Sequence, residues 1–173
     1  MAEPQKFENF INGQWKEPQG GNYYPDINPA DYSDIVGYFP LSTKNDVDEA
    51  IQSAHIAFKS WSHMLPAERA KYLEKFAQLL DQEKQRIGEA LCREEGKTIK
   101  EAVGEPSRGA VETSFFIGEG QRLEGITMPS DRKGVVSVAT RVPIGVVAAI
   151  SPWNFPFLTP VRKVIPALVF GNT

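Results

Sequence analysis

Cysteine, histidine and long apolar runs are all scarce in this chain of 173 residues. Its single cysteine, Cys92, excludes an internal disulfide and fits a reducing compartment. The two histidines, His55 and His63, have no cysteine or carboxylate beside them at ligand spacing, so we expect no metal site. The longest apolar run, from Val142 to Ile150, is far too short to span a bilayer.

The chain also lacks a strong excess of one charge, since its formal net charge is −3. We therefore expect neither nucleic acid nor an anionic membrane surface as a partner. The start of the chain, Met1 to Lys6, has no apolar core of a signal peptide. Hydrophobic residues make up 41% and charged residues 24%, which is typical of a globular protein. These values predict a soluble, cytoplasmic protein.

Short strands and turns are expected over residues 7–41. Asn12-Gly13 lies between two apolar-aromatic pairs and predicts a two-residue hairpin turn, because both central residues of a type I′ turn need positive φ. Gln19–Asn22 and Asp26–Pro29 are predicted loops, and Asp34–Phe39 is a predicted strand. Nothing in this stretch indicates catalysis.

Three helical blocks follow. Thr43 and Asp46 form a capping-box pattern before an apolar stripe that runs to Trp61. Pro66 suits the first turn of a second helix, and Gly96 predicts its end after about residue 95. We expect the apolar faces of these helices to pack and their Glu and Lys side chains to be solvated.

The third block runs from Thr98 to about Gln121 and is interrupted at Gly104-Glu105-Pro106. Because proline removes a helical hydrogen bond, we predict two pieces or a kink there. Cys92, on the apolar side of the preceding helix, is predicted to be a buried, inert thiol.

The hydrophobic period changes after Leu123. Ile126–Met128 and Val135–Thr140 predict two strands joined by the polar turn at 129–134. The pair looks too polar and too thinly covered for a core element. It either joins the sheet edge of a second subunit or forms a solvated surface ribbon, and the residues alone leave both open.

Gly145–Ile150 is continuously apolar, which predicts a strand in the middle of a parallel sheet. Prolines at 152 and 156 then force a sharp turn, and a helix is expected over roughly 157–170 with Gly171 as its cap. Strand, turn and helix together predict half of a βαβ unit. Asn154 therefore lies at the carboxyl end of a strand, where open α/β sheets bind ligands.

Asn154 has two interpretations. A preorganised side-chain amide can donate a hydrogen bond to an oxyanion that develops on a substrate carbonyl, which lowers the barrier by roughly 3 kcal/mol. Alternatively, Asn154 only caps the following helix, since Asn is a good N-cap residue. The physical argument alone favours the cap.

The strings around this turn closely resemble the NAD(P)-dependent aldehyde dehydrogenase superfamily. They are Thr140-Arg141-Val142-Pro143-Ile144-Gly145-Val146-Val147, Ser151-Pro152-Trp153-Asn154-Phe155-Pro156, Lys163, Pro166-Ala167-Leu168 and Gly171-Asn172-Thr173. Earlier matches are Phe10-Ile11-Asn12-Gly13-Gln14-Trp15, Asn28-Pro29-Ala30, the helix from Val47 to Trp61, and Glu95-Gly96-Lys97. The resemblance is most similar to the α-ketoglutaric semialdehyde dehydrogenase branch and covers essentially the whole chain.

The resemblance implies an α/β fold: the amino-terminal part of the aldehyde dehydrogenase fold, with the start of a Rossmann-like parallel sheet, packed helices and an oligomerisation hairpin. Residues 1–122 and 143–173 then belong to an incomplete dinucleotide-binding domain. Residues 123–142 are the hairpin, through which a homo-oligomer is expected. The catalytic domain is expected to be absent.

The resemblance also implies site residues, an aldehyde substrate, and NAD or NADP as cofactor. Asn154 matches the family's oxyanion-hole amide. Ser151, Pro152 and Trp153 match the turn whose backbone lies along the dinucleotide. The sequence does not decide between NAD and NADP.

Four further positions match those that line the family's substrate tunnel: Phe155, Leu158, Thr159 and Arg162. Their spacing predicts one helical face. A guanidinium at Arg162 suits a carboxylate, so we hypothesise an acidic semialdehyde substrate. The alternative is that Arg162 forms a salt bridge with a neighbouring element.

The resemblance places the family's catalytic cysteine and general-base glutamate beyond Thr173, and no residue of this chain replaces them. Binding of the cofactor by this chain alone is not expected either. We therefore expect the chain alone to be inactive. It is either the leading segment of an aldehyde dehydrogenase or a non-catalytic module that oligomerises through its hairpin.

Overall fold

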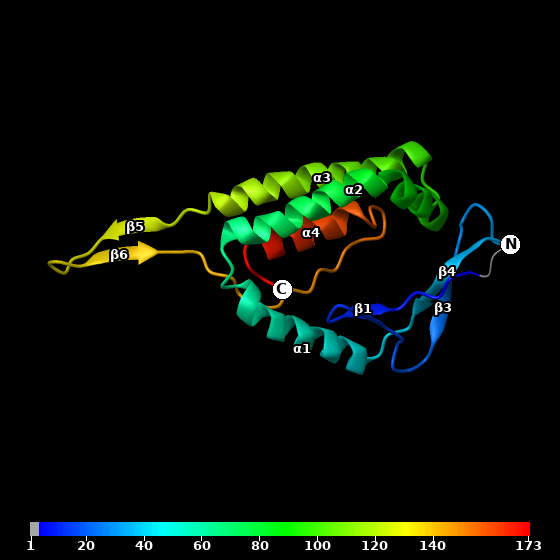
Figure 1. Cartoon of the computed structure of the whole chain (residues 1–173), viewed down its shortest axis with the longest axis horizontal. Coiled ribbons are helices and arrows are strands. Elements are labelled where there is room, and N and C mark those ends of the chain that lie inside the picture. Colours follow the sequence, from blue (N-terminus) through cyan, green and yellow to red (C-terminus); the bar gives the residue numbers. More distant parts are fainter. Residues whose placement is uncertain (1–3) are drawn as a thin grey trace.

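The computed structural model describes residues 4–173 (Figure 1). The prediction about Met1–Lys6 therefore lies partly outside the described residues. Strands β1 (Asn9–Ile11) and β2 (Gln14–Lys16) form the expected antiparallel hairpin. Its turn residues, Asn12 and Gly13, have φ values of 54° and 73°, which confirms the positive-φ turn.

A second antiparallel hairpin consists of β3 (Tyr23–Ile27) and β4 (Ile35–Pro40). The predicted strand at Asp34–Phe39 is confirmed to within one residue. The loop predicted at Asp26–Pro29 is partly wrong, because β3 continues through Ile27. Pro25 sits inside this strand, as proline can in a strand that pairs on one side only.

Helix α1 (Lys44–Trp61) begins with the predicted capping box. Asp46 Oδ2 accepts hydrogen bonds from the Thr43 N–H (2.6 Å) and the Thr43 hydroxyl (2.8 Å). The expectation that its apolar face packs is largely wrong for the described residues, since Val47 and Ile51 are each 51% exposed. Figure 1 shows α1 set apart from the other helices.

Helices α2 (Pro66–Glu95), α3 (Ile99–Gln121) and α4 (Leu158–Val169) lie side by side and contain the core (Figure 1). The core consists of Ala70, Leu73, Ile117, Val161, Ile165 and Val169. Gly96 ends α2 with a φ of 80°, as predicted. The predicted division of α3 into two pieces is wrong: the helix continues through Pro106, whose side chain is fully buried, so packing outweighs the lost hydrogen bond.

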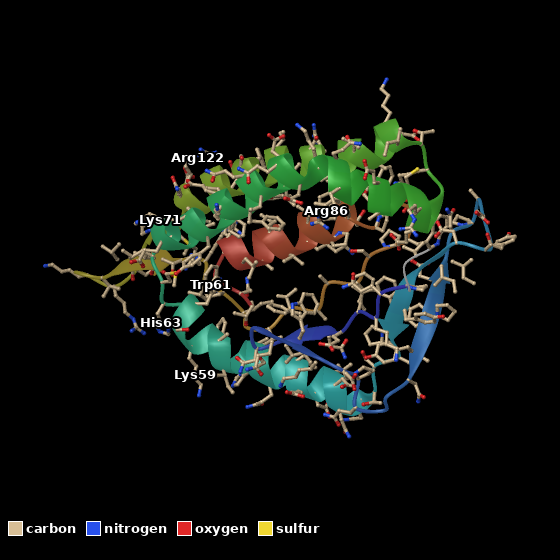
Figure 2. All side chains as sticks on the ribbon, turned by 45° about the vertical axis from the view of Figure 1, so that its right-hand side comes forward. Lys59, Trp61, His63, Lys71, Arg86 and Arg122 are labelled. Atoms are coloured by element: carbon tan, nitrogen blue, oxygen red, sulfur yellow. The ribbon has the colours of Figure 1, made fainter. Side chains whose placement is uncertain are left out.

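Two buried polar contacts fasten the carboxyl end of α4. The Trp61 indole N–H donates to the Leu168 carbonyl at 3.0 Å, and Figure 2 shows Trp61 beside α4 at the end of α1. The Arg69 Nε donates to the Val169 carbonyl at 3.0 Å, and its Nη1 reaches the Met64 carbonyl. Arg69 thus supplies a donor for a carbonyl at the helix end, and Trp61 adds a second donor to the Leu168 carbonyl, which also accepts from the Gly171 N–H.

Strands β5 (Ile126–Pro129) and β6 (Val136–Ala139) form the predicted hairpin, which extends away from the helices (Figure 1). Its apolar side chains are open to solvent: Ile126 is 64%, Val136 69% and Val138 62% exposed. Within the described residues, these side chains therefore pack against little of the rest of the chain.

The strand predicted at Gly145–Ile150 is absent from the described structure, where this segment has no regular secondary structure. Its backbone pairs with the backbone of Thr173. The Thr173 N–H donates to the Gly145 carbonyl (3.1 Å), and the Val147 N–H donates to the Thr173 carbonyl (2.7 Å). This is the bonding pattern of a single parallel rung, which is too short for a strand. Helix α4 and the positive φ of Gly171 (86°) follow as predicted.

Candidate functional site

The turn between Ile150 and α4 carries the predicted site. Ser151 is half-buried, whereas Pro152, Trp153, Asn154 and Phe155 are exposed. The amino end of the turn is fastened by Lys163 of α4, whose Nζ donates to the Ile150 carbonyl. The two prolines at 152 and 156 leave the turn few backbone hydrogen bonds of its own, so side chains from other elements have to hold it.

Asn154 does not cap α4. The backbone N–H groups of Phe157 and Leu158 donate to Glu105 Oε2, at 3.2 and 2.9 Å. A carboxylate from α3 therefore occupies the site where an Asn cap would act, and it also suits the positive end of the helix dipole. The cap interpretation of Asn154 is wrong, and the Asn154 side chain stays at the surface of the turn.

Glu105 is a residue of this candidate site that the sequence analysis missed. We expected the Glu and Lys side chains of the helices to be solvated, but the Glu105 side chain is only 3% exposed. The available signal was its position next to Pro106. Pro106 stays inside α3, and the Glu105 carboxylate beside it is buried where α3 packs against the start of α4.

Lys97, in the turn between α2 and α3, was missed for the same reason. Its side chain is 11% exposed and forms ion pairs with Glu105 and, at 2.8 Å, with Glu95. The ammonium also donates to the Asn154 carbonyl at 3.2 Å and lies 4.8 Å from the centre of the Phe155 ring. Burial disfavours the charged form, but the hydrogen bonds to Glu105 and Glu95 outweigh it and raise the pKa of Lys97.

The three residues predicted to lie along a dinucleotide, here called the shelf, are half-buried at Ser151 and exposed at Pro152 and Trp153. Trp153 is 81% exposed and Ile150, just before the turn, 83%. Within residues 4–173, the buried Ser151 Oγ has no hydrogen-bond partner. A buried hydroxyl without a partner is uncommon in proteins.

The four predicted tunnel residues occupy different environments. Leu158 is buried (6% exposed) and Thr159 is half-buried, whereas Phe155 and Arg162 are exposed. One of the four is therefore buried, one is half-buried and two are exposed. Their role as a tunnel lining stays a prediction.

Arg162 already has a carboxylate partner in this chain. Its Nε and Nη2 each lie 2.7 Å from an oxygen of Glu112 on α3, which is a bidentate ion pair. Arg108 reaches the same carboxylate at 2.8 Å. The hydrogen bond from Arg162 is the main cause that lowers the pKa of Glu112 to about 2. The alternative interpretation of Arg162, a salt bridge to a neighbouring element, is present in the structure.

Residues 4–173 contain no group of three or more His, Cys, Asp and Glu side chains that could hold a metal ion. His55 and His63 are exposed, and Cys92 is half-buried rather than fully buried as predicted. None of the helices within residues 4–173 combines the length and apolarity needed to cross a membrane.

Comparison with known proteins shows which family this chain is similar to. The sequence model of the Aldehyde dehydrogenase family matches residues 15–173. The chain is 44% identical over 173 residues to the alpha-ketoglutaric semialdehyde dehydrogenase of Bacillus subtilis (strain 168), covering all of this chain and 36% of that protein. It is 39% identical over 173 residues to the malonate-semialdehyde dehydrogenase of the same organism, covering all of this chain and 35% of that protein.

Solved structures also match the fold of this chain. The NADP-dependent glyceraldehyde-3-phosphate dehydrogenase of Bacillus halodurans C-125, complexed with NADP, superposes with a TM-score of 0.91 at 36% identity, over 99% of this chain and 37% of that one. The NAD-dependent aldehyde dehydrogenase of Sinorhizobium meliloti gives a TM-score of 0.93 at 29% identity, over 98% of this chain and 34% of that one. The chain spans about a third of the length of the relatives it matches. It belongs to the aldehyde dehydrogenase family.

Proposed function

We propose that this chain supplies the oxyanion donor and part of the cofactor site for NAD(P)-dependent oxidation of an aldehyde to a carboxylate. The observation that carries the proposal is the Asn154 turn. In a member of this family, Asn154 follows the apolar segment 145–150, and Glu105 has taken over the capping of α4. The exposed Asn154 amide is therefore available to donate a hydrogen bond to a carbonyl oxygen that gains negative charge.

The shelf at Ser151–Trp153 fits one part of a dinucleotide. Trp153 offers an exposed aromatic surface beside the turn. When bound, the dinucleotide accepts a hydride, and the shelf orients it. The reaction also needs a nucleophilic thiolate and a general base. This chain matches only about a third of the length of its relatives.

For the substrate, we infer a semialdehyde of a dicarboxylic acid. Both Bacillus subtilis relatives described above carry semialdehyde dehydrogenase names. A substrate carboxylate at Arg162 has to share or displace Glu112, which now binds both nitrogens of the fork. Replacing Arg162 by Leu tests this: an unchanged preference for acidic over neutral aldehydes removes Arg162 from substrate recognition.

The proposed oxyanion role can be tested in a chimera in which residues 1–173 replace the matching leading part of the Bacillus subtilis alpha-ketoglutaric semialdehyde dehydrogenase. We expect Asn154→Ala to lower kcat by about 100- to 1,000-fold, the usual cost of removing one such donor, with binding of the cofactor retained. The control is Asn45→Ala, at an exposed position in the first turn of α1, which should leave kcat unchanged. If Asn154→Ala keeps full kcat, the proposed role is wrong.

A second candidate function, a non-catalytic module that oligomerises, is favoured by the exposed ribbon. Three apolar side chains of β5 and β6 (Ile126, Val136 and Val138) are more than half exposed, and such a ribbon is a template for pairing with another chain. Sedimentation of the purified chain tests this: replacing Val136 and Val138 by Thr should shift an oligomer to monomer. A chain that stays monomeric throughout contradicts it.

A further inference from the structure

We propose that Lys97 and Glu105 are positioning residues that hold the Asn154 turn in the geometry needed by its amide. The inference depends on the function proposed above, because it gives these two residues an effect on the reaction through Asn154. Neither side chain is proposed to touch a reacting atom.

The ion pair holds the turn on both sides of the Asn154 side chain. Lys97 Nζ donates to the carbonyl of Asn154 itself at 3.2 Å. Glu105 Oε2 accepts from the N–H groups of Phe157 and Leu158, three and four residues further on. One charged pair therefore fixes the backbone from which the amide projects and the start of the helix that follows.

The strength of this device comes from burial. The Lys97 and Glu105 side chains are 11% and 3% exposed, so water screens their attraction weakly. Glu105 meets the positive end of α4, and the Lys97 ammonium balances its charge. The same ammonium lies 4.8 Å from the Phe155 ring centre, so it also holds the residue after Asn154.

These contacts supply the turn with hydrogen bonds that its two prolines cannot make. Prolines 152 and 156 donate no backbone hydrogen bond, and Asn154 and Phe155 are exposed. A displacement of about 1 Å of a group that must meet a developing charge costs about 100-fold in rate. The position of the Asn154 amide therefore has to be fixed by contacts from outside the turn. Within the described residues these contacts come from α3 and from the turn that precedes it.

The experiment is a double-mutant cycle in the chimera described above. Glu105→Gln keeps the size of the side chain and removes its charge. Lys97→Arg keeps the positive charge beside Glu105 but moves the N–H donor away from the Asn154 carbonyl. It replaces Glu105→Gln in the cycle if that variant does not fold. Each is measured alone and together with Asn154→Ala, and thermal unfolding confirms that each variant is folded.

We expect each single variant to lower kcat by about tenfold or more, with a KM for the dinucleotide that changes less than about twofold. In the Asn154→Ala background the same changes should lower kcat by less than about twofold, because the group they position is gone. A purely structural role predicts equal losses in both backgrounds.

The control is Lys16→Met, which breaks an ion pair with Glu49 between β2 and α1, away from the turn, and should not couple to Asn154. Equal losses with and without the Asn154 side chain overturn the positioning role and leave the proposed function intact. Full kcat in the Asn154→Ala single variant overturns the proposed function itself. The two failures are therefore distinguishable.

Discussion

Gly88 provides a sharp test of how α2 and α3 pack. A Cβ atom added there would lie 2.4 Å from Val103 Cγ2 and 2.8 Å from both the backbone N and the Cα of Val103. Rotation of a side chain can relieve the first contact but not the other two, so the helices have to move apart. Overpacking of this kind costs about 1–3 kcal/mol, against about 1 kcal/mol that Ala gains over Gly in a helix. Because three contacts are this short, we expect the cost to exceed the gain, so that Gly88→Ala destabilises the fold by about 1–2 kcal/mol.

The matched control is Gly104→Ala on α3. A Cβ at Gly104 meets nothing within 4 Å, so the helix-propensity gain should appear alone, as a stabilisation of about 0.5–1 kcal/mol. The measurement is urea unfolding of the purified chain followed by far-ultraviolet circular dichroism. The two variants carry the same chemical change on facing helices and should move the midpoint in opposite directions at an unchanged slope.

The refuting result is a Gly88→Ala variant that unfolds at the same or a higher urea concentration than the parent. In that case α2 and α3 do not approach at Val103 as closely as the structure shows. Failure of Gly104→Ala to stabilise would instead indicate that the exposed side of α3 is strained near its proline.

Three further predictions concern single side chains of the described fold. Arg69→Met should lower the free energy of unfolding by about 2–3 kcal/mol, because the carbonyls it serves lose a charged donor; a loss below about 0.5 kcal/mol contradicts this. Asp46→Ala removes the acceptor for Thr43 and should lower the free energy of unfolding in urea by about 1 kcal/mol. An unchanged free energy of unfolding would show that this cap does not stabilise the fold. The pKa of Glu112 is lowered from 4.5 to about 2 when folded, so its contribution is complete above pH 4.5 and is lost as pH falls toward 2. Because Arg162 is half-exposed, we discount that contribution to about 1–2 kcal/mol, and Glu112→Gln should flatten the acid limb of the stability profile.

Local chemistry made much of this fold predictable. Asn12-Gly13 required positive φ, Asp46 could reach Thr43, and Gly96 could end a helix, whatever the rest of the chain did. The boundaries of α2 and α4 followed from the same kind of signal. The family resemblance rested on the turn strings, and the comparisons confirm it.

What the sequence could not reveal depends on contacts between distant segments. Pro106 remains inside α3 because it is buried, and the 145–150 segment is not a strand because its described partner is one residue, Thr173. The sequence marked Asn154 but not the pair that holds its turn. In the sequence, Lys97 and Glu105 look like ordinary surface charges, and only their contacts with the Asn154 turn and the start of α4 show otherwise.

The contacts around the Asn154 turn also have a consequence for the order of folding. α2 and α3 are joined by a short turn, whereas Lys97 and Asn154 are 57 residues apart, and Glu105 and Leu158 are 53 apart. Long loops close late because their entropy cost precedes any gain from contact. The α2–α3 hairpin should therefore form first and serve as the template on which the turn becomes ordered last. Amide hydrogen exchange should then be faster at Phe157 and Leu158 than in the middle of α2, and mutations in the ion pair should accelerate unfolding more than they slow folding.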